Sequence, residues 1–155
     1  MPQLNKGGKF VFGRSRVGED GSLRIPPQAV EEYGLCREDR VYIFTGAKAT
    51  GGFCVTRRGL LAPSKLGHIL RENPALDGFA LPAGELISYK GRRYGWLPLL
   101  SQGRLSLASA LLEKLMLVPG AELLCIRSSD IAFTLGAKGP LLERAKNFSG
   151  EIPVY

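Results

Sequence analysis

The feature that most constrains this chain is an internal repeat. When the sequence is shifted by 82 positions, a second run of strand and helix patterns falls on the first. A repeat of this length in 155 residues predicts one structural unit used twice, each copy burying its apolar face against the other. Where residues 21–35 fall on 103–117, the identical pairs are Gly21/Gly103, Leu23/Leu105, Glu31/Glu113 and Leu35/Leu117.

Each copy reads as strand, tight turn, strand, short helix, strand, turn and strand. Apolar residues also coincide at Ile25/Leu107 and Val41/Leu123, and after a gap of four residues 53–56 falls over 131–134. The second helix is expected to begin at Ser109 as its N-cap. The expected strands cover 9–17, 23–25, 40–44 and 53–56 in the first copy, and 94–100, 104–107, 122–127 and 131–134 in the second.

These patterns predict a mostly β fold with short helices, organised in four parts. Residues 1–61 form a first repeat with a basic N-terminal arm, and 62–88 a helical and irregular connection. Residues 89–150 form a second repeat that ends in a helix at about 140–146, and 151–155 is a tail. Within the connection we expect a helix over 63–73 and irregular chain over 73–83, and we expect the segment 147–155 to be loosely held.

Composition excludes several classes of protein. No apolar run approaches the roughly 18 residues needed to cross a bilayer, and the first residues lack the apolar core of a signal peptide. We therefore expect a cytoplasmic protein without a membrane partner. Three cysteines and one histidine, with no Cys-x-x-Cys pair, argue against a zinc site, so no cofactor is expected. No nucleophile lies near a candidate base in the sequence, so we expect no enzymatic activity.

The charge balance favours a polyanionic partner. Twenty-one Lys and Arg against fourteen Asp and Glu give a net charge of +7. If Val11, Gly13, Ser15 and Val17 point inward, alternation turns the neighbouring side chains outward. The outward set is Phe10, Phe12, Arg14, Arg16 and, from the returning strand, Arg24, with Lys6 and Lys9 on the arm before it.

The first copy resembles the AbrB/SpoVT family. The resemblance rests on Val17 before a Gly-rich turn, the alternating strand that ends in Ile25-Pro26, the pair Gly34-Leu35, and Asp39 before an apolar strand. It covers about residues 11 to 58, and the second copy matches more weakly over about 94 to 135. Two copies in one chain are similar to the MraZ regulators. The implied fold is a swapped-hairpin β-barrel made by two interlocked units.

The resemblance implies a DNA-binding transcriptional regulator that forms a homo-oligomer and contacts double-stranded DNA through a basic β-hairpin. A two-stranded ribbon is narrow enough to enter the major groove, where arginine contacts phosphates and guanine edges. The run 90–93 adds basic residues between Tyr89 and Tyr94, a pattern that can also hold nucleic acid. The candidate DNA-binding residues are Lys6, Lys9, Arg14, Arg16, Arg24, Arg57, Arg58, Arg92, Arg93 and Arg104.

Two alternatives stay open on the sequence alone. The family's Gly-Arg element reads Gly21-Ser22 in the first copy, and the Asp-x-x-x-Arg element of MraZ proteins is absent from both copies. Together with the apolar Trp96 and Pro98 at the positions of Arg14 and Arg16, this favours a protein-interaction or antitoxin-like module. A regulator or enzyme that senses a small molecule ranks last, because no residue pattern names a ligand. An apolar pocket with convergent polar groups would favour it.

Overall fold

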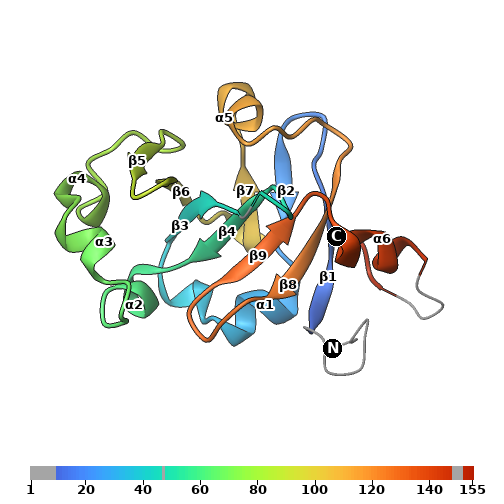
Figure 1. The fold of residues 1–155 in the computed structure, drawn as a ribbon, viewed down its shortest axis with the longest axis horizontal. Coiled ribbons are helices and arrows are strands. Elements are labelled where there is room, and N and C mark those ends of the chain that lie inside the picture. Colours follow the sequence, from blue (N-terminus) through green and yellow to red (C-terminus); the bar gives the residue numbers. More distant parts are fainter. Residues whose placement is uncertain (1–9, 47, 148–151) are drawn as a thin grey trace.

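The protein is mostly β, with a few short helices. The computed structural model describes residues 10–46, 48–147 and 152–155, and its strands form one seven-stranded antiparallel sheet and one two-stranded ribbon (Figure 1). The sheet has the order β1-β8-β9-β4-β3-β6-β5, and the ribbon consists of β2 and β7. The strands are β1 (Val11–Arg16), β2 (Ser22–Arg24), β3 (Arg40–Thr45), β4 (Phe53–Thr56), β5 (Ile87–Tyr89), β6 (Arg92–Pro98), β7 (Arg104–Ser106), β8 (Glu122–Arg127) and β9 (Phe133–Gly136).

Short helices follow the β2 and β7 strands and cover parts of the sheet. Pro27 occupies the first turn of α1, where a backbone N–H would have no partner within the helix, so the missing N–H of proline costs no hydrogen bond. Gly34 follows the end of α1 and adopts the left-handed conformation, with a φ of 60°, that terminates the helix. The helices are α1 (Pro27–Glu32), α2 (Arg58–Leu61), α3 (His68–Arg71), α4 (Pro74–Asp77), α5 (Ser109–Lys114) and α6 (Pro140–Lys146), and single 3-10 turns lie at Leu35–Arg37 and Ser101–Gly103.

The strands of each half pair mainly with strands of the other half. A tight turn at Gly18 follows β1, yet β1 forms its ladder with β8, and β2 forms its ladder with β7. Likewise β3 pairs with β6 as well as with β4, and β4 pairs with β9. The sheet begins at β1 and ends at β5, so among the described residues no closed ring of strands is found where a barrel was expected.

The main core lies between one face of the sheet and the β2–β7 ribbon. Leu23 and Leu105, which are opposite each other in the ribbon, are both fully buried. They pack with Val41, Phe53 and Leu123 from the sheet, and with apolar residues of α1 and α5. At roughly 1.5–3 kcal/mol for each large apolar side chain removed from water, this cluster is the main source of stability.

The opposite face of the sheet is covered only at its two ends. At the β6–β3 end, α2, α3 and α4 form a second cluster that includes Tyr42, Leu61 and Ile69. At the β1–β8 end, α6 forms a third cluster that includes Leu124 and Leu142. The middle of this face, over β4 and β9, lies between the two clusters.

Several expectations from the sequence were wrong in detail. Phe12 was expected to point to solvent, but it is buried in the main core, because the strand register shifts between Val11 and Gly13 and this changes the alternation at the start of β1. The N-cap of α5 is Ala108, and Ser109 is the first helical residue. Residues 63–73 are helical only over α3, and the segment expected to be irregular contains α4. The strand β5 was not expected.

The end of the chain was expected to be loosely held, but it lies along β1. Arg14 N donates to Pro153 O at 2.8 Å, Tyr155 N donates to Arg14 O at 2.7 Å, and Arg16 N donates to Tyr155 O at 2.9 Å. These bonds create a parallel bridge at the outer edge of β1, and Ile152 is buried in the third cluster. No helix in the described part of the chain is both long and apolar enough to cross a membrane.

Candidate nucleic-acid interface

Two arginines face each other across the β2–β7 ribbon. Because Leu23 and Leu105 point into the core, alternation turns Arg24 and Arg104, which are paired in register, toward solvent. Arg104 is exposed and Arg24 is half-buried. The Arg24 Nε donates to Gln102 O at 3.3 Å, and its guanidinium lies 5.5 Å from the centre of the Tyr155 ring.

Two further arginines lie on β1, the strand that neighbours this ribbon. Ser15 Oγ, fully buried, donates to Arg24 O at 2.6 Å and so joins β1 to β2. The residues on either side of it, Arg14 and Arg16, project away from the main core. Because Ser15 points toward the ribbon, Arg14 and Arg16 lie on the opposite side of β1, whereas Arg24 and Arg104 lie on the ribbon side. Both pairs border the end of the chain, since Arg14 donates to Ile152 O and the Arg24 guanidinium lies near the Tyr155 ring. We call these four predicted site residues, which lie on two sides of the β1 edge, the arginine face: Arg14, Arg16, Arg24 and Arg104.

A single carboxylate neutralises part of the arginine face. Arg14 Nη1 lies 3.3 Å from Glu122 Oε2, and Arg16 Nη2 lies 2.7 Å from Glu122 Oε1. The hydrogen bond from Arg16, with the charges of Arg14 and Arg16, holds the pKa of Glu122 below its usual value of 4.5. Arg14 is mostly buried and also donates to Ile152 O at 3.1 Å, whereas 59% of the Arg16 side chain is exposed. Arg16 is thus the freer of the two guanidiniums.

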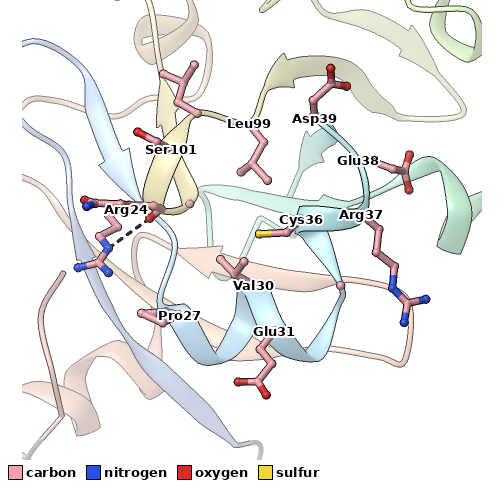
Figure 2. Close-up of a pocket in the computed structure, with 14 residues that line it drawn as sticks. Arg24, Pro27, Val30, Glu31, Cys36, Arg37, Glu38, Asp39, Leu99 and Ser101 are labelled. Carbon is pink, nitrogen blue, oxygen red and sulfur yellow. Dashed lines mark hydrogen bonds between the residues drawn. The ribbon is translucent and has the colours of Figure 1, made fainter.

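An open pocket adjoins the arginine face. It has a volume of about 920 Å³ and lies between α1, the turn at 35–37 and the chain at 99–103 (Figure 2). Arg24 and Arg37 line it, but so do Glu31, Glu38 and Asp39. Because these charges are mixed, the pocket does not extend the positive surface beyond Arg24 in that direction.

The other predicted site residues do not join the arginine face. Arg57 is 12% exposed, donates to Tyr33 O at 2.7 Å and pairs with Glu38 at 2.9 Å, so its role is to hold α1 in place. Arg58 pairs with Asp77 at 2.9 Å. Arg92 and Arg93 are exposed on β6, which four strands separate from β1 in the sheet. Lys6 and Lys9 lie outside the described residues.

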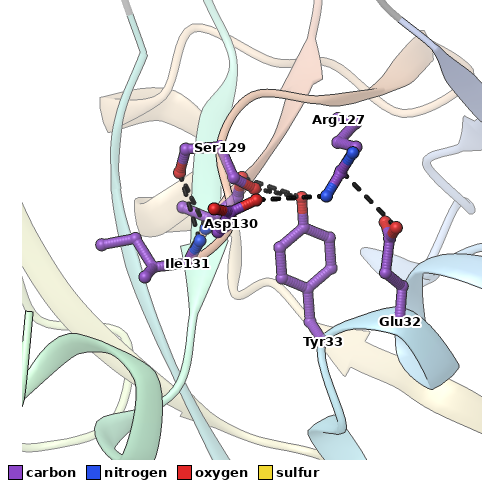
Figure 3. Close-up of polar contacts among 7 residues, drawn as sticks. Glu32, Tyr33, Arg127, Ser129, Asp130 and Ile131 are labelled. Atoms are coloured by element: carbon purple, nitrogen blue, oxygen red, sulfur yellow. Dashed lines mark hydrogen bonds and ion pairs between the residues drawn. The ribbon is translucent and has the colours of Figure 1, made fainter.

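A polar contact that the sequence did not predict ties α1 to the loop between β8 and β9. The Tyr33 hydroxyl donates toward Ser129 O at 2.7 Å and lies 3.1 Å from Ala132 O (Figure 3). Arg127 lies between Glu32 at 3.5 Å and Asp130 at 3.2 Å. Burial is the main cause that raises the pKa of Tyr33 to about 12. The contact fixes the first half of the chain against the second.

The chemistry of the arginine face is recognition of anions. Guanidinium groups stay protonated at all ordinary pH values and donate two parallel hydrogen bonds to a phosphate. No cluster of side chains able to hold a metal ion occurs among the described residues. Sequence reasoning missed Glu122 and Tyr155, because both lie more than one hundred positions from the arginines that they contact. The chain matches no known protein-family model, and no curated protein matches it.

Proposed function

We propose that this chain consists of two copies of a swapped-hairpin unit of the AbrB/SpoVT type, and that it is a transcriptional regulator that binds double-stranded DNA through the arginine face. The proposal has two parts, a duplicated fold and a nucleic-acid surface. Each part has its own support in the contacts described above.

The positions of the helices and strands support the duplication. Adding 82 to the bounds of α1 gives the bounds of α5, and the same shift converts β2 into β7 and β3 into β8. The helix N-caps, Pro26 and Ala108, also correspond. Two unrelated segments have no reason to share element lengths and spacings over such a distance.

The strand register supports the swap. Arg14 pairs with Leu124 in the β1–β8 ladder. Adding 82 to the first residue number gives Trp96, and subtracting 82 from the second gives Tyr42. These two residues pair with each other in the β3–β6 ladder. Each ladder joins the first strand of one copy to the third strand of the other. This register is the one that a duplicated fold with an approximate twofold axis between Leu23 and Leu105 requires, and it therefore supports the proposal.

Backbone conformation at equivalent positions agrees as well. Gly21 and Gly103 both have positive φ, 80° and 71°, and each accepts a reciprocal bond: Ile25 N donates to Gly103 O and Leu107 N donates to Gly21 O. A Cβ on Gly21 would lie 2.1 Å from Leu107 O, so only glycine fits at this crossing. Gly103 shares the positive φ, and a Cβ there would lie 2.9 Å from Val30 Cγ2.

The observation that carries the DNA-binding proposal is the placement of charge. Under the twofold relation, Arg24 and Arg104 correspond to Ser106 and Ser22 at the other end of the ribbon, while Arg14 corresponds to Trp96. Arg24 and Arg104 therefore lie together at one end of the ribbon, and Arg14 and Arg16 lie on the other side of the neighbouring β1, where Glu122 is the carboxylate that contacts both. A two-stranded ribbon is narrow enough for the major groove, and this one turns Arg24 and Arg104 toward solvent.

Salt-dependent binding to a duplex of about 30 base pairs tests this proposal. If Arg24 and Arg104 each neutralise one phosphate, the double variant Arg24→Gln/Arg104→Gln has a slope of log K against log salt that is shallower by about 1.8. Arg71→Gln, an exposed arginine on α3 behind the opposite face of the sheet, is the matched control and leaves the slope unchanged. Arg104→Gln alone, at an exposed position, keeps the test valid if the double variant is unstable.

A second function, a protein-interaction module, is favoured by one surface feature. Met116 and Val118, after α5, are large apolar residues that are 89% and 66% exposed. One experiment distinguishes the two functions. The protein-interaction module is supported if the wild-type chain binds no duplex at 50 mM salt but co-purifies with a protein that the Met116→Asp variant does not retain. Binding with a steep salt slope supports the regulator.

A further inference from the structure

The uncovered middle of the sheet's outer face contains a second pocket, of about 640 Å³. Its floor is formed by β4 and β9, and its walls come from the two apolar clusters that cover the ends of the same face. Leu61, Ile69 and Ile131 belong to one wall, and Ile126 and Leu141 to the other. Sites that bind small molecules have volumes of about 300 to 1,000 Å³ and largely apolar walls, so this pocket has the size and lining of such a site.

The floor of this pocket carries polar groups in an otherwise apolar surrounding. Cys54 Sγ lies 3.4 Å from Thr134 Oγ1, and the hydroxyls of Ser128 and Thr134 are hydrogen-bonded to each other. Thr56 Oγ1, fully buried, donates to Ile131 O. Thr134 pairs with Cys54 in the β4–β9 ladder and Ser128 lies at the exposed end of β8, so the hydroxyls of Ser128 and Thr134 can bond to a polar substituent of a bound molecule.

The rim of the pocket is positive. Lys90 and Arg92 line it together with His68, and none of the described lining residues is an aspartate or glutamate. Both cations lie over aromatic rings of the rim: Lys90 Nζ is 5.3 Å from the centre of the Tyr89 ring, and the Arg92 guanidinium is 5.7 Å from the centre of the Phe44 ring. Tyr89 is held in place by His68 Nδ1, 2.9 Å from its hydroxyl, and by a bond that its hydroxyl donates to Glu72.

We propose that this pocket binds a small aromatic carboxylate. The apolar walls, with the rings of Phe44, Tyr89 and Tyr94, accept a flat hydrophobic body, because aromatic rings pack favourably edge to face or offset. The cations at the rim bind the carboxylate, and the absence of acidic lining in the described residues disfavours cationic and zwitterionic molecules. None of the four residues of the arginine face lines this pocket, so the inference does not rest on DNA binding.

Equilibrium dialysis of the full chain with 2-naphthoate, compared with the neutral 2-naphthylmethanol, tests the proposal. We expect 2-naphthoate to bind one site per chain and at least fivefold more tightly than the alcohol. Arg92→Gln removes a rim cation and weakens 2-naphthoate binding about fivefold, while binding of the alcohol does not change. The matched control is Arg93→Gln, since Arg93 is an equally exposed neighbour on β6 that does not line the pocket, and it leaves both affinities unchanged.

A blocking variant locates the binding. Ser128 is exposed and lines the pocket, so Ser128→Trp places an indole in the space without disturbing the core. Loss of 2-naphthoate binding in Ser128→Trp, with an unchanged circular dichroism spectrum, supports the site. Three results would overturn the proposal: no binding of 2-naphthoate at millimolar concentration, equal binding of the neutral alcohol, or full binding by Ser128→Trp.

Discussion

Replacing Glu122 with glutamine changes the charge of the arginine face while keeping its shape. Glu122 accepts hydrogen bonds from Arg14 and Arg16, and its lowered pKa means that it stays ionised at neutral pH. Glutamine has almost the same size and keeps one carbonyl oxygen for the shorter bond to Arg16. The variant therefore frees about one unit of positive charge at β1 and leaves the β1–β8 ladder in place.

The size of the effect follows from counterion release. One additional phosphate contact makes the slope of log K against log salt steeper by about 0.9, which raises affinity about eightfold at 0.1 M salt and about twofold at 0.4 M. We therefore expect Glu122→Gln to bind a duplex more tightly than the wild type, with a gain that shrinks as salt is added. Few substitutions that remove an ion pair are expected to strengthen binding, so an increase in affinity for the duplex is informative whatever its size.

Fluorescence anisotropy with a labelled duplex, repeated over 50 to 400 mM salt, measures both quantities. Glu85→Gln makes the same chemical change before β5, at the opposite edge of the sheet, and serves as the control with unchanged affinity. If Glu122→Gln binds with the wild-type affinity and slope while remaining folded, Arg14 and Arg16 do not contact DNA. The reasoning about the arginine face is then refuted for β1.

Three further predictions concern stability, and urea unfolding measures each of them. Ile152→Ala lowers the free energy of unfolding by about 2 kcal/mol, because it removes buried apolar surface between the end of the chain and α6; an unchanged value contradicts the observed packing. Tyr33→Phe lowers the free energy of unfolding by about 1 kcal/mol, because it removes the hydroxyl hydrogen bond. The raised pKa of Tyr33 contributes stability that is complete below its usual value of 10 and is lost as pH rises through about 12. The variant therefore loses less stability than the wild type between about pH 10 and pH 12. Met116→Gly stabilises by about 1 kcal/mol, because Met116 has a φ of 58° that favours glycine, whereas Gly34→Ala at the equivalent position destabilises; a loss in the first variant argues against backbone strain.

Local patterns in the sequence predicted individual elements well. The strand expected at 122–127 is β8 with the same bounds, and 40–44 is β3 within one residue. Apolar alternation and the Pro-Gly boundaries of α1 are local properties, so a short window of sequence contains them. The mostly β class with short helices, confirmed by the structure, follows from the same patterns.

The pairing of strands and the partners of the arginines could not be predicted in the same way. A turn after β1 favours a simple hairpin, and only the three-dimensional arrangement reveals that β1 pairs with β8 instead. Phe12 was misplaced because the strand register shifts between Val11 and Gly13, so the alternation counted from Ser15 and Val17 does not extend to Phe12. The neutralising contact of Glu122 with Arg16 joins residues 106 positions apart, and no spacing rule covers such a pair. The pocket over β4 and β9 likewise depends on where α3 and α6 pack.

Residues 153–155 also affect whether another strand can add to the β1 edge of this sheet. An exposed strand edge offers free amides that template the addition of another molecule, the first step toward fibres. Along β1 the amides of Arg14 and Arg16 are already occupied by Pro153 and Tyr155 of the same chain. The opposite edge strand, β5, has only three residues. Addition of a further strand to this sheet is thus opposed at β1 by residues 153–155 of the same chain, and at β5 by the short length of the edge strand.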